Sequence, residues 1–232
     1  MHIAVIDDDE DVLNFVKHVL TGDGHHCFLY RSGRKFLAAL QRETFDLFIV
    51  DWTMPEMSGM EIIQWVKTRL PQCPPVMMLT NRSQNEEIAG ALNAGADDFV
   101  VKPESAIVLS ARVNALLRRH GMGAGGEDVP LQFGGYSFNR RRDVVTLAGE
   151  EIQLTSKEFA LALLFFTNLN RPLSRPYIME TVWLSVATLS TRTLDMHVSR
   201  IRAKLSLRPE NGFSLRTIFG YGYRLEPYYA QI

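Results

Sequence analysis

Three aspartates stand where short apolar runs of the chain end. Asp7 and Asp8 follow residues 3–6, and Asp51 follows residues 47–50. If these runs are parallel strands of one sheet, their carboxyl ends meet at one edge and bring the three carboxylates together. Clustered carboxylate oxygens suit Mg²⁺, which keeps several waters and leaves positions for a phosphoryl oxygen. The spacing therefore predicts a metal site at that edge.

Two further groups follow later apolar runs and add phosphoryl chemistry. Thr80 supplies a hydroxyl, and Lys102, which precedes Pro103, supplies an ammonium. A plainer alternative treats the acids from Asp7 to Asp11 as a solvated cluster that a helix N-terminus favours. One threonine or one lysine alone carries little weight. Because four strand ends deliver compatible groups, the pattern favours phosphoryl transfer to a carboxylate.

These groups meet only if the first half of the chain folds in a particular way. We expect strands at 3–6, 27–30, 47–50, 76–79 and 99–101, and helices at 11–20, 33–41, 59–69, 84–94 and 105–118. Continuous apolar strands that alternate with helices are typical of a parallel sheet covered on both faces. Right-handed crossovers then give a doubly wound, five-stranded α/β domain.

A glycine-rich stretch divides the chain into halves of opposite charge. Residues 121–130 contain four glycines and little that could pack, which predicts a flexible linker between domains 1–120 and 131–232. The net charge of −1 disfavours a nucleic-acid partner at first sight. Divided at the linker, however, it becomes −4 for residues 1–120 and +5 for residues 131–232.

The composition narrows the class of protein further. With 46% hydrophobic and 22% charged residues, the chain is typical of an ordinary globular protein. Two cysteines are too few for a disulfide framework and indicate reduced thiols. The longest apolar run is far shorter than a membrane span. We therefore expect a cytoplasmic protein without a membrane partner.

The second half predicts an α+β domain with a basic helix. A small antiparallel sheet is expected over residues 131–155, and helices are expected from Thr155, over 174–184 and over 191–206. Thr155 and Glu158 have the spacing of a capping box. In the last helix, the apolar stripe leaves a polar face that could enter a major groove or simply be solvated: Arg192, Thr193, His197, Ser199, Arg200 and Lys204.

Five separated segments in the first half resemble response-regulator receiver domains, which have a flavodoxin-like fold. They include Val5–Asp9, Asp51–Gly59, Leu79–Thr80 and Val100–Pro103. The resemblance implies that Asp51 accepts a phosphoryl group from a sensor histidine kinase. It also implies a Mg²⁺ site formed by Asp7, Asp8, Asp51 and the Thr53 carbonyl, a phosphoryl contact from Lys102, and a switch formed by Thr80 and Phe99.

The same resemblance implies a dimer surface on the receiver. Ile88 and Val108 stand where relatives often carry a Lys–Glu pair, whereas Asp97, Asp98 and Arg112 match the family pattern. We therefore expect a homodimer on phosphorylation, in which an apolar contact replaces one ion pair and Asp98 pairs with Arg112 of the partner subunit.

The second half resembles the winged helix-turn-helix domain of OmpR/PhoB-type regulators. The matching segments are Leu154–Phe159, Trp183, Arg192–Leu205 and Gly220–Leu225. The resemblance implies binding to double-stranded promoter DNA and a contact with RNA polymerase. The candidate DNA contacts are Thr193 and Arg200 at base edges, Arg192, His197, Arg202 and Lys204 at phosphates, and Ser199, Arg216 and Tyr223. Phe219 stands where relatives often place an arginine in the wing.

Two alternatives to a phosphorylation-controlled transcription regulator stay open. A phosphohydrolase with an aspartyl nucleophile would carry a second acid two residues after Asp51, where Thr53 stands, and a substrate cap, of which the sequence gives no sign. A constitutive dimer that binds DNA without phosphate is supported by Ile88 and Val108, and by Asn81, which stands beside Thr80 where the resemblance implies a small residue. In the favoured interpretation the receiver catalyses its own phosphorylation and slow dephosphorylation and is otherwise not an enzyme.

Overall fold

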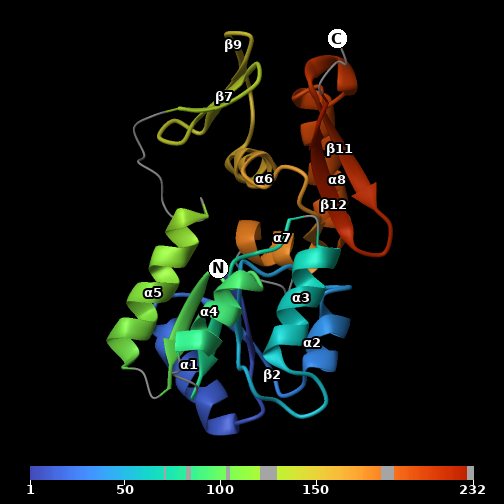
Figure 1. Ribbon diagram of the computed structural model, residues 1–232. Coiled ribbons are helices and arrows are strands. Elements are labelled where there is room, and N and C mark those ends of the chain that lie inside the picture. The colour runs from blue at the N-terminus through green and yellow to red at the C-terminus, as the bar shows by residue number, and fades with distance from the viewer. Residues whose placement is uncertain (71, 82–84, 103–104, 121–129, 184–190, 229–232) are drawn as a thin grey trace. The chain divides into compact units, whose positions relative to one another are not determined.

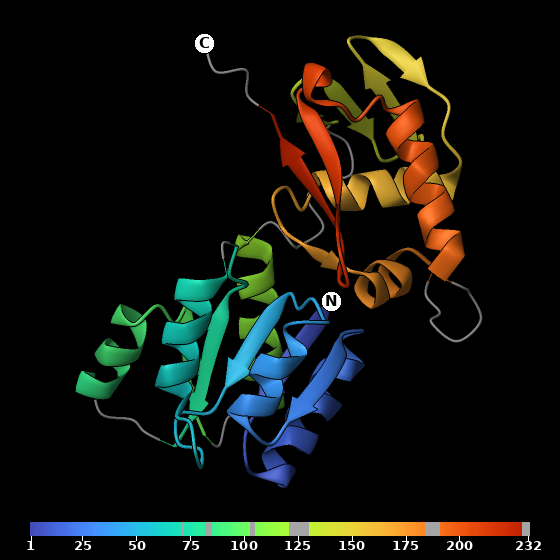
Figure 2. The same ribbon diagram turned by 90° about the vertical axis from the view of Figure 1, so that its right-hand side faces the viewer.

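The chain forms two compact units, residues 1–124 and residues 125–232, which we describe separately (Figure 1, Figure 2). The computed structural model describes residues 1–70, 72–81, 85–102, 105–120, 130–183 and 191–228, with the backbone alone at 85–88 and 191. Within these ranges, no helix is long and apolar enough to cross a membrane. The predicted linker, 121–130, lies almost entirely outside the described residues and stays a prediction.

The first unit alternates strands and helices around one parallel sheet. Its elements are β1 (His2–Ile6), α1 (Glu10–Gly22), β2 (His26–Tyr30), α2 (Gly33–Ala39), β3 (Leu47–Val50), α3 (Gly59–Arg69), β4 (Val76–Thr80), α4 (Asn85–Asn93), β5 (Asp98–Val101) and α5 (Ala106–Arg119). The strand order is β2-β1-β3-β4-β5. The order reverses between β1 and β3, and ligands of such sheets bind beyond the carboxyl ends of the strands at that point.

Each face of this sheet carries its own core. Successive strand residues point to opposite faces, so Ile3 and Val5 pack with α1 and α5, whereas Ala4 and Ile6 pack with α2, α3 and α4 (Figure 1). The described strand residues of β1, β3 and β4 are buried throughout. This explains why the sequence shows continuous apolar runs in place of alternation.

The second unit combines two antiparallel sheets with three helices. Its elements are β6 (Leu131–Phe133), β7 (Tyr136–Asn139), β8 (Val144–Leu147), β9 (Glu150–Ile152), α6 (Ser156–Phe166), β10 (Leu173–Ser174), α7 (Arg175–Trp183), α8 (Thr191–Lys204), the short 3-10 helix η1 (Pro209–Asn211), β11 (Phe213–Ile218) and β12 (Gly222–Pro227). The sheet orders are β6-β7-β8-β9 and β10-β12-β11.

An aromatic core joins these parts of the second unit. The Phe138 and Phe166 rings lie 4.8 Å apart and connect the first sheet to α6. The buried hydroxyl of Tyr136 donates to the carbonyl of Leu205 at 2.6 Å and so ties β7 to the end of α8. Gly222 lets β12 approach β10, because a Cβ at this position would lie 2.1 Å from the Leu173 carbonyl oxygen.

The predicted fold class is confirmed in both halves. The five strands and five helices expected before the linker are present within one or two residues of their expected bounds. The capping box of Thr155 and Glu158 begins α6 as expected. The short elements β10 and η1 were not predicted, because segments of two or three residues carry no measurable periodicity.

Candidate functional site

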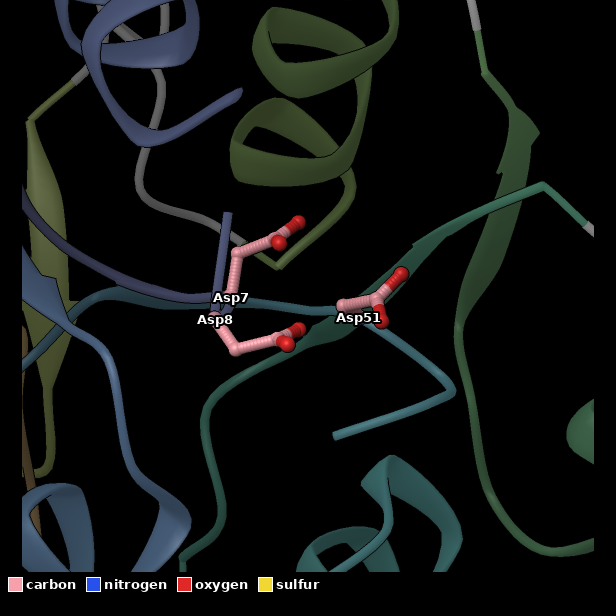
Figure 3. Close-up of side chains that lie close together, drawn as sticks. All are labelled: Asp7, Asp8 and Asp51. Carbon is pink, nitrogen blue, oxygen red and sulfur yellow. The ribbon is translucent and has the colours of Figure 1, made fainter. Parts of the chain in front are cut away.

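The three predicted carboxylates meet at the carboxyl edge of the first sheet. Asp7 and Asp8 follow β1, and Asp51 follows β3 (Figure 3). One carboxylate oxygen from each lies within 4.8 Å of the others. Asp7 and Asp51 are buried, whereas Asp8 is more accessible. The prediction that the strand ends bring these groups together is confirmed.

Lys102 holds two of these carboxylates from the end of β5. Its Nζ donates to Asp7 Oδ2 at 2.5 Å and to Asp51 Oδ1 at 2.8 Å. Burial opposes the charged ammonium, but the hydrogen bonds and charges of Asp51 and Asp7 outweigh it and raise the pKa of Lys102. Burial also raises the pKa of Asp7, against the hydrogen bonds from Lys102 and from the Asp9 N–H. One ammonium therefore faces more negative charge than it can neutralise.

The local backbone fixes these side chains. The Asp9 carboxylate accepts from the N–H of Asp11 at 2.9 Å and so caps α1 directly after the two acids. The Asp51 carboxylate accepts from the N–H of Thr53 at 2.9 Å. Gly59 allows α3 to begin against the same segment, because a Cβ there would lie 2.2 Å from the Asp51 carbonyl oxygen. The Asp51 backbone and carboxylate are therefore both held in place, by the start of α3 and by the Thr53 N–H.

A cavity of about 670 Å³ opens beside these carboxylates. Thr53 and Thr80, both named from the sequence, line it, as does Asn81. Sequence reasoning missed its apolar wall, Val12, Phe15 and Leu79. The signal was faint: Val12 and Phe15 are neighbours on one side of α1, but their helical spacing does not separate a cavity wall from ordinary core.

The two predicted switch residues lie on neighbouring strands, Thr80 at the end of β4 and Phe99 within β5. Thr80 is buried at the end of β4, and its carbonyl accepts from the Lys102 N–H at 2.8 Å. Phe99, in β5, is half-buried against the core shared with α2, α3 and α4. Thr80 and Phe99 thus lie on β4 and β5, and Lys102 directly follows β5.

The donor set fits a hard divalent cation. Ionised Asp7, Asp8 and Asp51 with one protonated Lys102 leave a local net charge of about −2, and carboxylate oxygens at this density are the ligands that Mg²⁺ prefers. The cavity leaves room for the waters that Mg²⁺ retains. The site thus has the charge and the ligands for the ion expected from the sequence.

The charged residues expected at a dimer surface already have partners within the chain. Asp97 binds Lys67 Nζ at 2.9 Å, and Asp98 lies 3.3 Å from Arg112 of the same chain. Val108 is exposed, and the side chain of Ile88 lies outside the described residues. Formation of an Asp98–Arg112 pair between subunits would therefore exchange one exposed ion pair for another, at small cost.

The polar face predicted on α8 divides into exposed side chains, Lys204 among them, and half-buried ones. Leu194, Val198 and Ile201 are buried, as expected. The exposed positions of the described side chains include Arg192, Met196, Ser199 and Arg200. Thr193 is half-buried, and its carbonyl accepts a hydrogen bond from His197 Nδ1 at 2.8 Å. Met196, which sequence reasoning missed, lies on the same face as the two arginines.

Four predicted DNA contacts are engaged inside the second unit. His197 lies edge-on to Trp183, with ring centroids 5.2 Å apart. Lys204 Nζ binds the buried Glu158 carboxylate at 2.8 Å. Arg202 donates through Nε to the Leu215 carbonyl at 2.9 Å. Each of these side chains therefore contacts another residue of the second unit, which the sequence did not predict.

Tyr223, the fourth of these residues, is buried between elements. Its hydroxyl donates to the Asp195 carboxylate, which also pairs with Arg175 at 2.7 Å. The guanidinium carbons of Arg175 and Arg202 lie 5.3 and 5.5 Å from its ring centroid. Burial raises the pKa of Tyr223. This arrangement ties the hairpin to α7 and α8. The DNA contact predicted for Tyr223 stays a prediction.

The sequence matches two protein families. Residues 3–114 match the response regulator receiver domain, and residues 149–225 match the C-terminal domain of transcriptional regulatory proteins. The chain is 34% identical to the sensory transduction protein RegX3 of Mycolicibacterium smegmatis, over 97% of this chain and 98% of that protein.

Two further similar proteins match this chain over nearly its full length. The chain is 30% identical to the phosphate regulon transcriptional regulatory protein PhoB of Pseudomonas aeruginosa, over 96% of each protein. The solved structure of the response regulator DrrB, a Thermotoga maritima OmpR/PhoB homologue, is 31% identical, covers 97% of this chain and 98% of its own, and has a TM-score of 0.48.

Proposed function

Because this chain belongs to the two-component response regulators that join a receiver to an OmpR/PhoB-type DNA-binding domain, we propose that phosphorylation of Asp51 by a sensor histidine kinase controls its binding to promoter DNA. The observation that carries the proposal is the Lys102 ammonium, which lies between Asp7 and Asp51 at the edge of an open cavity.

The proposed reaction moves a phosphoryl group from a kinase phosphohistidine to Asp51. An Asp51 oxygen attacks phosphorus, the histidine N–P bond breaks, and the released imidazole nitrogen takes up a proton. Lys102 Nζ, 2.8 Å from Asp51 Oδ1, is placed to offset the charge of the transferred oxygens. Thr80 can donate to the phosphoryl group once it has formed. In-line attack by water on the acyl phosphate would return Asp51 to its carboxylate and release inorganic phosphate, so we expect slow self-dephosphorylation.

Mg²⁺ is part of the proposed site. Asp7, Asp8 and Asp51 would hold it together with the backbone carbonyl of Thr53, and when bound it would stabilise negative charge on the phosphoryl oxygens. The role of the chain is to keep these oxygen ligands close together, with Asp7 and Asp51 buried and Asp8 accessible. The Lys102 contacts maintain that arrangement.

Phosphorylation at Asp51 is tested directly with a small phosphodonor. Acetyl phosphate and Mg²⁺ should phosphorylate the wild-type chain, as followed by intact-protein mass spectrometry, and chelation of Mg²⁺ should abolish the product. Asp51→Asn should show none, while Asp23→Asn, an acid outside the site, should be phosphorylated normally. Labelling of Asp51→Asn at the wild-type rate would refute the assignment.

In the second unit, we propose that α8 enters the major groove. Arg192 and Arg200 are exposed on α8 and have no partner among the described residues, so both are available to phosphates or base edges. Arg200→Ala should relax base preference at about one position. Wild-type discrimination by this variant between a selected site and a mutated site would contradict the assignment.

In this proposal, phosphorylation joins two chains into a homodimer, which places two DNA-binding domains on adjacent half-sites. The bound dimer would then influence RNA polymerase at the promoter. Its setting is the compartment that holds DNA, the cytoplasm. The exposed Ile107 and Val108 of α5 give an apolar element to the receiver surface, so a phosphate-independent dimer is the second candidate. If Asp51→Asn binds DNA as tightly as the phosphorylated wild type does, the result would favour that candidate.

A further inference from the structure

One aromatic side chain of the second unit has no apolar environment. Phe219 lies at the tip of the β11–β12 hairpin and is fully exposed. Gly220, next to it, has a φ of 72° and closes the turn, and the Tyr221 N–H donates to the Ile218 carbonyl at 3.0 Å. A tight turn thus presents a phenyl ring to solvent, an arrangement that costs hydrophobic free energy unless a partner covers the ring.

The hairpin holds its own cations away from this tip. Arg216 and Arg224 are cross-strand partners, and both bind the carboxylate of Glu226: Arg216 Nε at 2.9 Å and Arg224 Nε at 2.7 Å. In the register, the pairs at Thr217 and Ile218 separate them from the turn. The tip therefore offers an apolar ring and no free positive charge among its described residues.

The hairpin is also fixed to α8, whose outer face carries the proposed DNA contacts. Arg202 of α8 donates to the Leu215 carbonyl at 2.9 Å and to the Thr217 hydroxyl at 3.1 Å. At the other strand, Tyr223 binds Asp195 of α8. Within this unit the hairpin runs alongside α8 (Figure 2). DNA bound at the exposed arginines of α8 would therefore lie close to the hairpin.

We propose that Phe219 inserts into the minor groove next to the site read by α8 and packs against deoxyribose and a partly unstacked base step. The inference rests on the proposed DNA binding of α8 and specifies how the hairpin takes part. A phenyl ring on a narrow turn can enter a groove about 6 Å wide. Apolar wedges of this kind favour flexible pyrimidine–purine steps, such as TA and CA, because these unstack most readily.

This type of contact differs measurably from a charged one. An arginine that binds phosphate releases counterions, so its loss flattens the dependence of affinity on salt by about one unit of slope. A phenyl ring contributes through stacking and burial, which salt screens little. Loss of Phe219 should therefore lower affinity by a constant factor at every salt concentration.

The test uses the full chain, phosphorylated with acetyl phosphate, and a duplex that the wild-type protein selects from a random-sequence pool. Phe219→Ala should weaken binding about tenfold with an unchanged salt slope. Phe219→Leu should retain most of the affinity, and Phe219→Arg should steepen the slope by about one. Tyr228→Ala is the matched control, an exposed aromatic residue at the opposite end of the same hairpin, and should bind as wild type.

A second readout detects the wedge itself. 2-Aminopurine placed at successive flanking steps should brighten at one step with the wild-type chain and should not brighten there with Phe219→Ala. Unchanged affinity of Phe219→Ala, or the absence of any brightening, overturns the wedge. Weaker self-association of Phe219→Ala without DNA would instead assign the ring to a second copy of the chain. If the wild-type chain selects no duplex, the proposed DNA binding fails before the wedge is tested.

Discussion

At the scale of single residues, the receiver site concentrates charge that folding alone does not balance. Asp7 and Asp51 are buried within reach of one ammonium, that of Lys102, and Asp8 adds a third carboxylate. Buried like charges oppose folding unless they are paired. The same imbalance that costs stability would favour the binding of a divalent cation, as proposed for this site. Stability and metal binding should therefore change in opposite directions when one carboxylate is neutralised.

Asp7→Asn tests this opposition. Without Mg²⁺, the free energy of unfolding of the variant should exceed that of the wild type by about 1 kcal/mol, and its melting temperature should rise accordingly. The reason is that the substitution removes one buried negative charge and keeps the Lys102–Asp51 pair. Added Mg²⁺ should stabilise the wild type strongly and the variant weakly, since a ligand stabilises the folded state more when it binds more tightly. Calorimetry with and without Mg²⁺ measures both effects. Equal stabilisation of the two proteins by Mg²⁺ would remove Asp7 from the ligand set.

At the scale of elements, the second unit depends on an ion pair between helices. Lys204 of α8 binds Glu158 of α6, which also accepts from the Thr155 N–H at 2.9 Å. Burial disfavours the ionised carboxylate, but the hydrogen bonds from Lys204 and Thr155 outweigh burial and lower the pKa of Glu158. A carboxyl with a lowered folded pKa stabilises the protein above its unfolded pKa and loses that contribution as pH falls through the folded value.

Lys204→Met should therefore lower stability at neutral pH by about 2 kcal/mol, since it leaves a buried carboxylate without its cation. It should also flatten the fall in stability below about pH 4.5. Denaturant unfolding between pH 3 and pH 7 measures both effects, with Glu158→Gln/Lys204→Met as the charge-free control. If Lys204 acts at phosphates, as the sequence alone suggested, the variant instead keeps its stability and loses about one unit of salt slope on DNA.

The start of α3 allows a matched comparison between two glycines of the receiver. Gly59→Ala places a Cβ 2.2 Å from the Asp51 carbonyl oxygen, so the backbone must move, whereas Gly90 in α4 has nothing within 4 Å of its would-be Cβ. We expect Gly59→Ala to destabilise by about 3 kcal/mol and to slow phosphorylation. Gly90→Ala should stabilise by about 0.5–1 kcal/mol through helix propensity. Similar melting temperatures for the two variants would contradict the proposed steric role.

The strand ends could be predicted because the positions of Asp7, Asp51 and Lys102 follow from one rule, that parallel strands present their carboxyl ends at one edge. The contacts that Arg202 and Lys204 make with neighbouring elements could not be predicted. Helical periodicity locates the buried stripe of α8, but residues beside that stripe turn inward or outward according to what packs there. Here β11 and α6 supply the partners, and neither neighbour can be assigned from the helix sequence.

At the scale of the whole molecule, the two halves should communicate through the number of DNA-binding domains placed on one duplex. If phosphorylation joins two receivers, the second domain binds at a high effective concentration, and affinity for two half-sites rises by about a hundredfold without any new contact. Affinity for a single half-site should hardly change. Fluorescence anisotropy with one-site and two-site duplexes, using phosphorylated wild type and Asp51→Asn, separates the two cases. An equal gain on both duplexes would mean that phosphorylation alters the DNA-binding domain itself, and equal binding by Asp51→Asn would mean a constitutive dimer.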